Sequence, residues 1–150
     1  MSEPLSVETV LVPVDGSDES VTAIEYAVAI AEKYGAAVHV VHVLGEEIVR
    51  GIETDTVDRD AVAADTEAFA ETASETAAGT GVSVTSSSAY GFSTTQKTRH
   101  PGSAVLDCAD EVGADFLVIP REPSTDGPGD VLERAAEYVL LYASQPVLST

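Results

Sequence analysis

Val7-Glu-Thr-Val-Leu-Val-Pro-Val-Asp-Gly-Ser-Asp-Glu-Ser20 is the stretch of sequence that determines the fold. Residues 10–14 are apolar on both alternating faces, a pattern typical of a parallel strand buried on both sides. Asp15-Gly16 then indicates a turn, and Ser17 is a suitable N-cap for a following helix. A buried strand, a tight turn and a capped helix predict the start of a βαβ unit. Asp15 then lies at the carboxyl end of a strand, where open α/β sheets bind their ligands.

The rest of the chain alternates between helical and strand patterns. Helices are predicted over residues 17–34, 57–78, 101–112 and 131–143, and further strands over 37–44, 82–90, 116–119 and from 146 onward. Residues 45–56, 91–100 and 121–130 are predicted to be loops. This order predicts an α/β fold with an open, five-stranded parallel sheet and helices on both faces. Ser and Thr alternate through residues 82–90, which favours an edge position for that strand.

The chain is strongly acidic. Its 150 residues include 26 acidic side chains against seven Lys and Arg, giving a net charge of −19. Such a charge disfavours nucleic acid and anionic membrane surfaces as partners. The acidic residues are spread along the chain, and Lys occurs only at positions 33 and 97. This distribution suggests a halophilic protein, because the Debye length falls to ~3 Å at 1 M salt and self-repulsion is then screened.

The length predicts one domain over residues 1–150. Met1-Ser2-Glu3-Pro4 offers neither a basic nor an apolar segment, and no apolar run approaches the length of a membrane span. We therefore expect no signal peptide, no membrane segment and a cytoplasmic location. The single cysteine, Cys108, excludes an internal disulfide and fits a reducing compartment.

The sequence resembles the universal stress protein (Usp) family over nearly its whole length. The resemblance rests on segments that follow one another in the family's order: residues 10–17, Val-Leu-Val-Pro-Val-Asp-Gly-Ser; residues 35–43, with a His before the last Val; residues 101–109 and 114–119; and residues 145–148, Gln-Pro-Val-Leu. It implies a Rossmann-like sheet in the order 3-2-1-4-5. It also implies a homodimer joined through the last strand, which here contains Val147 and Leu148.

Many family members bind ATP or a related adenine nucleotide, and the resemblance implies where such a site would lie. Asp15 matches the family's aspartate after the first strand, and Val43 ends the matching second-strand segment. The family's glycine loop after the fourth strand does not match. In an alignment without gaps, its glycine positions fall on Pro120, Pro123 and Glu133, and its hydroxyl position falls on Arg134. Proline has no N–H for a phosphate oxygen, and a carboxylate repels phosphate, so we expect no ATP and no other cofactor.

Lys97, Arg99 and His100 form the one basic cluster in the sequence. They precede a predicted helix, in a connection that is longer than is usual in the family. A solvated loop that neutralises nearby acids is one explanation of this cluster. The alternative is a contact for an anion or a partner, which Arg121 and Arg134 could join because Arg binds phosphate in a bidentate manner.

The remaining reactive side chains favour structural roles. His39 and His42 are three apart on one strand and so point to opposite faces, which excludes a shared metal ion. We expect a backbone partner for His42 and an inert, buried thiol for Cys108, which has Asp107 and Asp110 beside it instead of a basic group. No catalytic or metal site is predicted.

Two functions remain open on the sequence. The first is a non-enzymatic stress-response protein that acts as a dimer or through a protein partner. The alternative is an adenine-nucleotide-binding protein with slow hydrolysis at most. In place of the glycine loop it would use Asp15, Val43, Arg121, Arg134 and the loop from Lys97 to His100.

Overall fold

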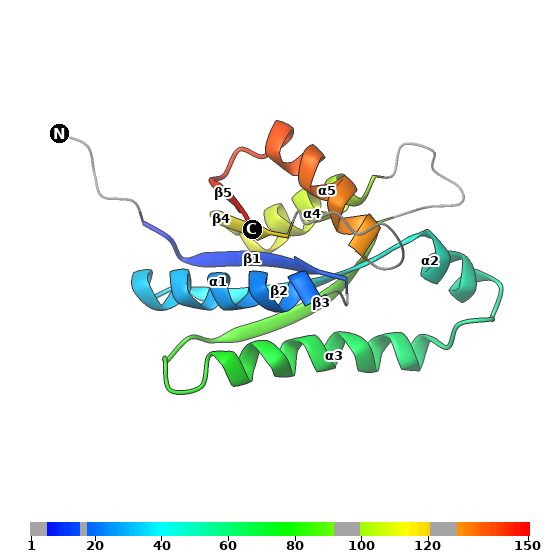
Figure 1. The fold of residues 1–150 in the computed structure, drawn as a ribbon, viewed down its shortest axis with the longest axis horizontal. Helices are drawn as coiled ribbons and strands as arrows, with labels where there is room; N and C mark the ends of the chain where they lie inside the picture. Colours follow the sequence, from blue (N-terminus) through cyan, green and yellow to red (C-terminus); the bar gives the residue numbers. More distant parts are fainter. Residues whose placement is uncertain (1–5, 16–17, 92–99, 121–128) are drawn as a thin grey trace.

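The computed structural model describes residues 6–15, 18–91, 100–120 and 129–150. Strands and helices alternate along the chain, except that two consecutive helices lie between the second and third strands (Figure 1). The elements are β1 (Thr9–Val14), α1 (Asp18–Tyr34), β2 (Ala37–Leu44), α2 (Glu46–Glu53), α3 (Arg59–Thr76), β3 (Val84–Tyr90), α4 (Pro101–Val112), β4 (Phe116–Ile119), α5 (Gly129–Tyr142) and β5 (Val147–Ser149). Across these residues, no helix combines the length and the hydropathy that crossing a membrane requires.

The five strands form one parallel sheet in the order β3-β2-β1-β4-β5. β1 lies at its centre and pairs with β2 from Thr9↔Ala37 to Val14↔His42. The predicted α/β fold and strand order are therefore confirmed. The predicted edge position of β3 is confirmed as well, and most of its side chains are exposed or half-buried.

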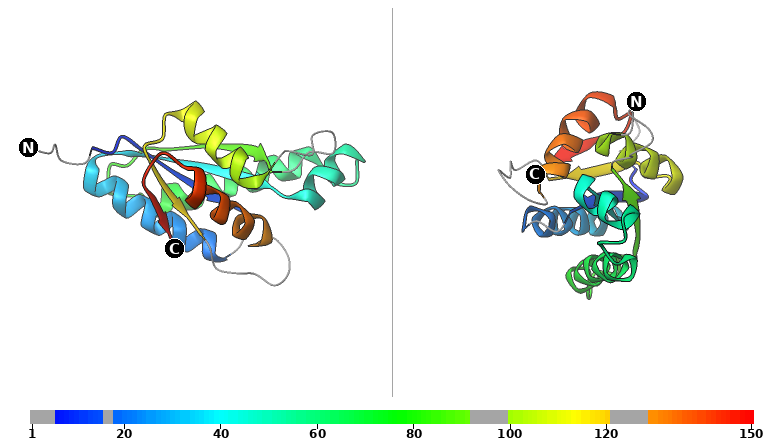
Figure 2. Two further views of the ribbon diagram at one scale, coloured as in Figure 1. Left: turned by 90° about the horizontal axis from the view of Figure 1, so that it is seen from above. Right: turned by 90° about the vertical axis from the view of Figure 1, so that its right-hand side faces the viewer.

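Helices cover both faces of the sheet, with α1 and α3 on one face and α4 and α5 on the other (Figure 2). β1 supplies both cores, because Val10 and Val12 pack toward α1 while Leu11 packs toward α4 and α5. The two-sided apolar pattern of residues 10–14 thus has a direct cause. A strand at the centre of a three-layer fold has no solvent-facing side.

The helix boundaries follow the expected signals. Gly35 and Gly113 end α1 and α4 with φ of 67° and 68°, a left-handed conformation that favours glycine. Pro101 occupies the first turn of α4, where its missing N–H costs no helical hydrogen bond. Asp115 anchors the other end of the sheet, since its carboxylate accepts the Glu8 N–H at 2.9 Å and the Thr9 N–H at 3.1 Å.

The prediction of a loop over residues 45–56 is wrong, because α2 spans Glu46–Glu53. α2 is amphipathic, and it buries Val49 and Ile52 against Leu44 and Val62 in a small cluster of their own. The apolar spacing of one helical turn was present in the sequence. It was obscured by the shortness of the helix and by the acidic residues on its exposed side.

Candidate functional site

The carboxyl end of β1 carries Asp15, which is 6% exposed. Its side chain turns toward the start of α1, where Oδ1 accepts the hydroxyl of Ser20 at 3.0 Å. The Asp15 backbone N–H in turn donates to Ser20 Oγ at 3.1 Å. This reciprocal pair ties the end of β1 to the first turn of α1. Ser17, the predicted cap, lies outside the described residues.

Val43 lies at the same edge of the sheet, near the end of β2. Its side chain is 1% exposed and belongs to the core beneath α4. The chain leaving β3 passes directly over it, because a Cβ on Gly91 would lie 2.9 Å from Val43 Cγ1 and 3.1 Å from the Leu44 carbonyl oxygen. The side chain of Val43 is therefore covered by protein, and only its backbone can be offered to a ligand.

The connection after β4 begins with Pro120, which is buried at the end of the strand. Arg134 lies on α5 with its side chain exposed. Arg121 and Pro123 lie outside the described residues, as do Lys97 and Arg99 of the predicted basic cluster. The structure thus places two of the four proposed nucleotide contacts, Asp15 and Val43, inside the fold and a third, Arg134, on its surface.

His100 is the described member of the basic cluster, and it serves as the N-cap of α4. Its Nδ1 accepts the Gly102 N–H at 2.9 Å, so this nitrogen carries no proton in that bond. The ring stacks on Tyr138 of α5 with centroids 4.6 Å apart. Burial, and then the charge of Arg134, lower the pKa of His100. His100 therefore caps the N-terminus of α4 and packs against α5. Its predicted contact to an anion or a partner stays a prediction.

His39 and His42 point to opposite faces of β2, as predicted. His39 lies toward α4, with Nδ1 2.7 Å from Thr85 Oγ1 and Nε2 2.8 Å from Ser87 Oγ. His42 lies toward α3, where Nδ1 is 2.9 Å from Thr66 Oγ1 and the ring meets Phe69 edge to face. The prediction of a backbone partner for His42 is wrong, because its Nδ1 bonds the side-chain hydroxyl of Thr66 on α3.

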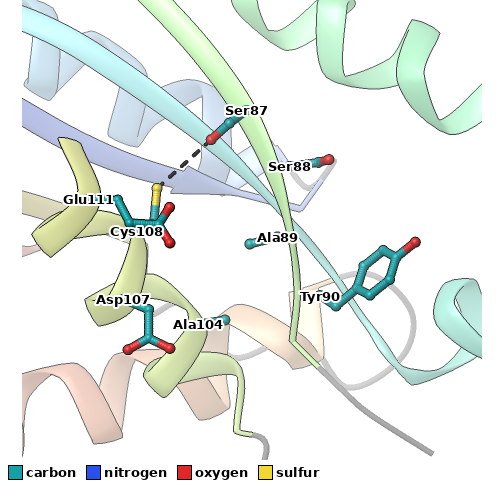
Figure 3. A pocket seen from close by; sticks show the side chains of 8 residues that line it. All are labelled: Ser87, Ser88, Ala89, Tyr90, Ala104, Asp107, Cys108 and Glu111. Atoms are coloured by element: carbon teal, nitrogen blue, oxygen red, sulfur yellow. Dashed lines mark hydrogen bonds between the residues drawn. The ribbon is translucent and has the colours of Figure 1, made fainter.

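A cavity of about 460 Å³ lies between β3 and α4 (Figure 3). Ser87, Ala89 and Ala104 form its inner part with Cys108, whose Sγ lies 3.8 Å from Ser87 Oγ. Burial raises the pKa of the Cys108 thiol, which keeps it protonated and a poor nucleophile. This cavity was not predicted from the sequence. The serine-rich pattern of residues 84–90 is the one sequence feature that could have pointed to it.

The described residues contain no cluster of His, Cys, Asp and Glu with the geometry of a metal site. Among the described residues at the carboxyl edge of the sheet, Asp15 bonds Ser20 through Oδ1 and His100 caps α4. These described residues can offer a ligand backbone groups, the exposed guanidinium of Arg134 and the second carboxylate oxygen of Asp15.

A parallel sheet in the order 3-2-1-4-5, with helices on both faces, defines a Rossmann-like α/β protein. Such folds bind ligands at the carboxyl ends of the strands, where Asp15 lies. Residues 6–149 match the model of the Universal stress protein family. The chain belongs to the universal stress protein family.

Solved structures agree with this assignment. A universal stress protein in complex with cAMP is 23% identical, with a TM-score of 0.67 over 97% of this chain and 98% of that one. The universal stress protein UspA from Lactobacillus plantarum is 20% identical, with a TM-score of 0.73 over 97% and 99% of the chains. The universal stress protein from Archaeoglobus fulgidus in complex with dAMP is 23% identical, with a TM-score of 0.64 over 97% and 98%. No curated protein matches the chain.

Proposed function

We propose that this protein is a cytoplasmic, non-enzymatic universal stress protein that acts through protein contacts, as a homodimer, without binding ATP. One observation carries the proposal. The carboxylate that would face a nucleotide, Asp15, accepts the Ser20 hydroxyl at 3.0 Å and is 6% exposed. A ribose would have to bind the second oxygen of this buried carboxylate, Oδ2, or replace the Ser20 hydroxyl on Oδ1.

The connection after β4 supports the same proposal from the sequence. Pro120 has no N–H, and the aligned glycine positions also include Pro123 and Glu133. A triphosphate carries several negative charges, and the protein already carries −19. Binding such an anion requires several backbone N–H donors in one concave loop, which two prolines cannot supply.

Isothermal titration calorimetry with Mg-ATP tests the proposal on the purified protein. We expect no binding tighter than millimolar. The absorbance spectrum of the supernatant after denaturation provides an independent check for nucleotide carried through purification, which we expect to be absent. Binding at micromolar concentration, or co-purified nucleotide in stoichiometric amount, would contradict the proposal.

A second candidate function is the binding of an adenine monophosphate. It is favoured by two of the similar structures, which are described as complexes with cAMP and with dAMP. A monophosphate needs fewer N–H donors than a triphosphate, and the exposed guanidinium of Arg134 could bind it in a bidentate manner. Titration with cAMP and dAMP, on the wild type and on Arg134→Ala, distinguishes this function from the first.

The dimer is supported by the C-terminal part of the fold. β5 is the outermost strand beside β4, and Val147 and Leu148 are half-buried in it. At the end of the preceding helix α5, Leu141 is 76% exposed and Tyr142 is 65% exposed. Apolar side chains next to an open strand edge favour a protein partner, and a twofold mate pairs such an edge with itself.

A further inference from the structure

We propose that His100 is a proton-sensitive cap, whose protonation in mildly acidic solution releases the first turn of α4 from α5 and from the carboxyl edge of the sheet. The device is a change in the conformation of the protein itself. It applies equally to a protein that binds a nucleotide and to one that binds a protein partner, so it does not rest on the proposed function.

The cap of α4 requires an imidazole nitrogen without a proton. His100 Nδ1 accepts the Gly102 N–H at 2.9 Å, and the backbone of His100 is extended, with φ of −123° and ψ of 142°, as in other N-caps. A doubly protonated imidazole has two donors and no acceptor, so it cannot receive this N–H. Gly102 is buried, and a buried N–H without an acceptor costs free energy until the turn moves and water reaches it.

The same imidazole joins the first turn of α4 to α5. Its ring stacks on Tyr138, with centroids 4.6 Å apart and 23° between the planes. A Cβ on Gly102 would lie 2.4 Å from Tyr138 Cβ, so the backbone of α4 contacts the base of the same side chain. The Tyr138 ring in turn lies 4.6 Å from the ring of Tyr142. Loss of the cap therefore disturbs the packing of α4 on α5 and not the helix end alone.

The described surroundings disfavour a protonated ring. Burial, and then the charge of Arg134 on α5, lower the pKa of His100 below its ordinary value of 6.5. The N-terminus of α4 adds positive potential. The face of Tyr138 attracts a cation and opposes these effects, and Glu137 beside it on α5 is an exposed carboxylate.

Further charged groups belong to the segments next to His100. Lys97 and Arg99 precede it outside the described residues, and the side chains of Asp130 and Glu133 on α5 are outside them as well. These are two cations and two carboxylates, and a measured pKa of His100 includes the effect of all four. The requirement for an unprotonated Nδ1 is independent of them, because it follows from the cap bond.

The sign of the pH dependence follows from the pKa. The capped form has a lowered pKa, whereas a released, solvated ring has the ordinary value, so the released form binds the proton more tightly. The capped form is therefore fully favoured above about pH 6.5 and is lost as the pH falls toward the lowered pKa. One proton changes the ratio of the two forms by at most about tenfold per pH unit.

Release of this turn would open the carboxyl edge of the sheet. A Cβ on Gly91 would lie 3.3 Å from Pro101 Cα and 2.9 Å from Val43 Cγ1, so Gly91 is enclosed between the start of α4 and the end of β2. Pro101 is itself buried. When the turn moves away, Val43 becomes accessible at the edge where open α/β sheets bind their ligands.

Hydrogen exchange followed by NMR tests the proposal on the full chain at pH 7.5 and 5.5, in constant high KCl. The Ala104 N–H donates to the His100 carbonyl at 3.0 Å and reports on the first turn of α4. The Val62 N–H makes the equivalent bond to the Asp58 carbonyl in α3, at 3.2 Å, and is the internal control because its helix is capped by a carboxylate. Between the two pH values, we expect the protection factor of Ala104 to fall about three- to tenfold and that of Val62 less than about twofold.

Two variants assign the effect to the imidazole. His100→Asn supplies a cap that does not titrate, so Ala104 should stay protected at both pH values. His100→Ala removes the cap, so Ala104 should be weakly protected at both. The ¹⁵N shifts of the wild-type ring give the pKa of His100, which we expect below 6.5. A constant protection factor of Ala104 in the wild type, an equal fall in His100→Asn, or a pKa of His100 at or above 6.5 would overturn the proposal.

Discussion

His39 Nε2 lies 2.8 Å from Ser87 Oγ, so a buried imidazole on β2 holds the edge strand β3 in place. The other ring nitrogen is engaged as well, at 2.7 Å from Thr85 Oγ1. A neutral imidazole has one donor and one acceptor nitrogen, and a hydroxyl can complement either. The edge strand β3 is thus positioned by a side chain whose pKa is lowered by burial.

This arrangement predicts a pH dependence of stability. Burial lowers the pKa of His39 below its ordinary value of 6.5. Burial also lowers the pKa of His42, against the opposing effects of Asp65 and Asp15. Below about pH 6.5 the unfolded chain therefore binds more protons than the folded protein, and the free energy of unfolding decreases as the pH falls toward the lowered pKa values. The limit is ~1.4 kcal/mol per pH unit for each histidine.

Urea denaturation at several pH values between 8 and 5.5, in constant high salt, measures this slope. His39→Gln and His42→Gln should each reduce it, whatever they do to the stability at pH 8. Slopes that are the same in the wild type and in both variants would show that carboxylates cause the pH dependence.

The second prediction concerns salt. We expect the melting temperature to rise as KCl is increased from low to molar concentration, because screening reduces the self-repulsion of a protein at −19. α3 provides a test of the cause, since Glu67, Glu71 and Glu75 are all exposed and follow one another at four-residue spacing. Replacing these three with Gln should raise the melting temperature at low salt and flatten the curve. A melting temperature that is constant or falls with KCl would contradict the halophilic interpretation.

The third prediction concerns the packing of α4 on α5. A Cβ on Gly102 would lie 2.4 Å from Tyr138 Cβ and 2.6 Å from its Cγ, so the two helices approach closely at this point. Gly102→Ala should decrease the free energy of unfolding by about 1–3 kcal/mol, even though alanine is the better helix former. Ser103→Ala, one residue along α4, is the control and should have little effect. Equal stabilities of the two variants would mean that α5 can shift away freely.

The fourth prediction concerns assembly. Light scattering should give a dimer, and removal of Gln145–Thr150 should give monomers or aggregates. A sharper variant follows from the ladder, in which Pro146 accepts from Leu117 and Thr150 donates to Ile119. The backbone of Ser149 therefore faces outward, and Ser149→Pro should give folded monomers while Ser149→Thr remains dimeric. An intact protein that is monomeric at micromolar concentration would contradict the proposed dimer.

The sequence predicted the fold well because local pattern and burial agree in its central strands. Residues 10–14 and 37–44 are apolar on both faces, and both are buried on both faces. It predicted contacts less well, because a contact depends on what the fold brings together. Thr66 is 24 residues from His42 along the chain, and nothing in either segment indicates the bond between them. The cavity between β3 and α4 was missed for the same reason, since its two walls come from separate segments of the chain.

The last prediction concerns the connection after β4. If the prolines and Glu133 prevent ATP binding, then restoring the family's pattern should create it. The variant carries Pro120→Gly, Pro123→Gly, Glu133→Gly and Arg134→Ser. Two regained charge-assisted hydrogen bonds, at roughly 1.5–3 kcal/mol each, would strengthen Mg-ATP binding more than a hundredfold over the wild type. Calorimetry measures this gain, and a melting curve checks the fold, since glycine within α5 costs about 1 kcal/mol.

Two controls make the outcome decisive. Asp15→Asn in the restored variant should weaken the new binding if this side chain turns from Ser20 toward the ribose, as the family's pattern implies. Arg134→Ala in the wild type examines the competing explanation, in which the guanidinium already binds phosphate. Micromolar ATP binding by the wild type that disappears in Arg134→Ala would replace the proposed function with a nucleotide-binding one, because an arginine would then be supplying what the glycine loop supplies elsewhere in the family.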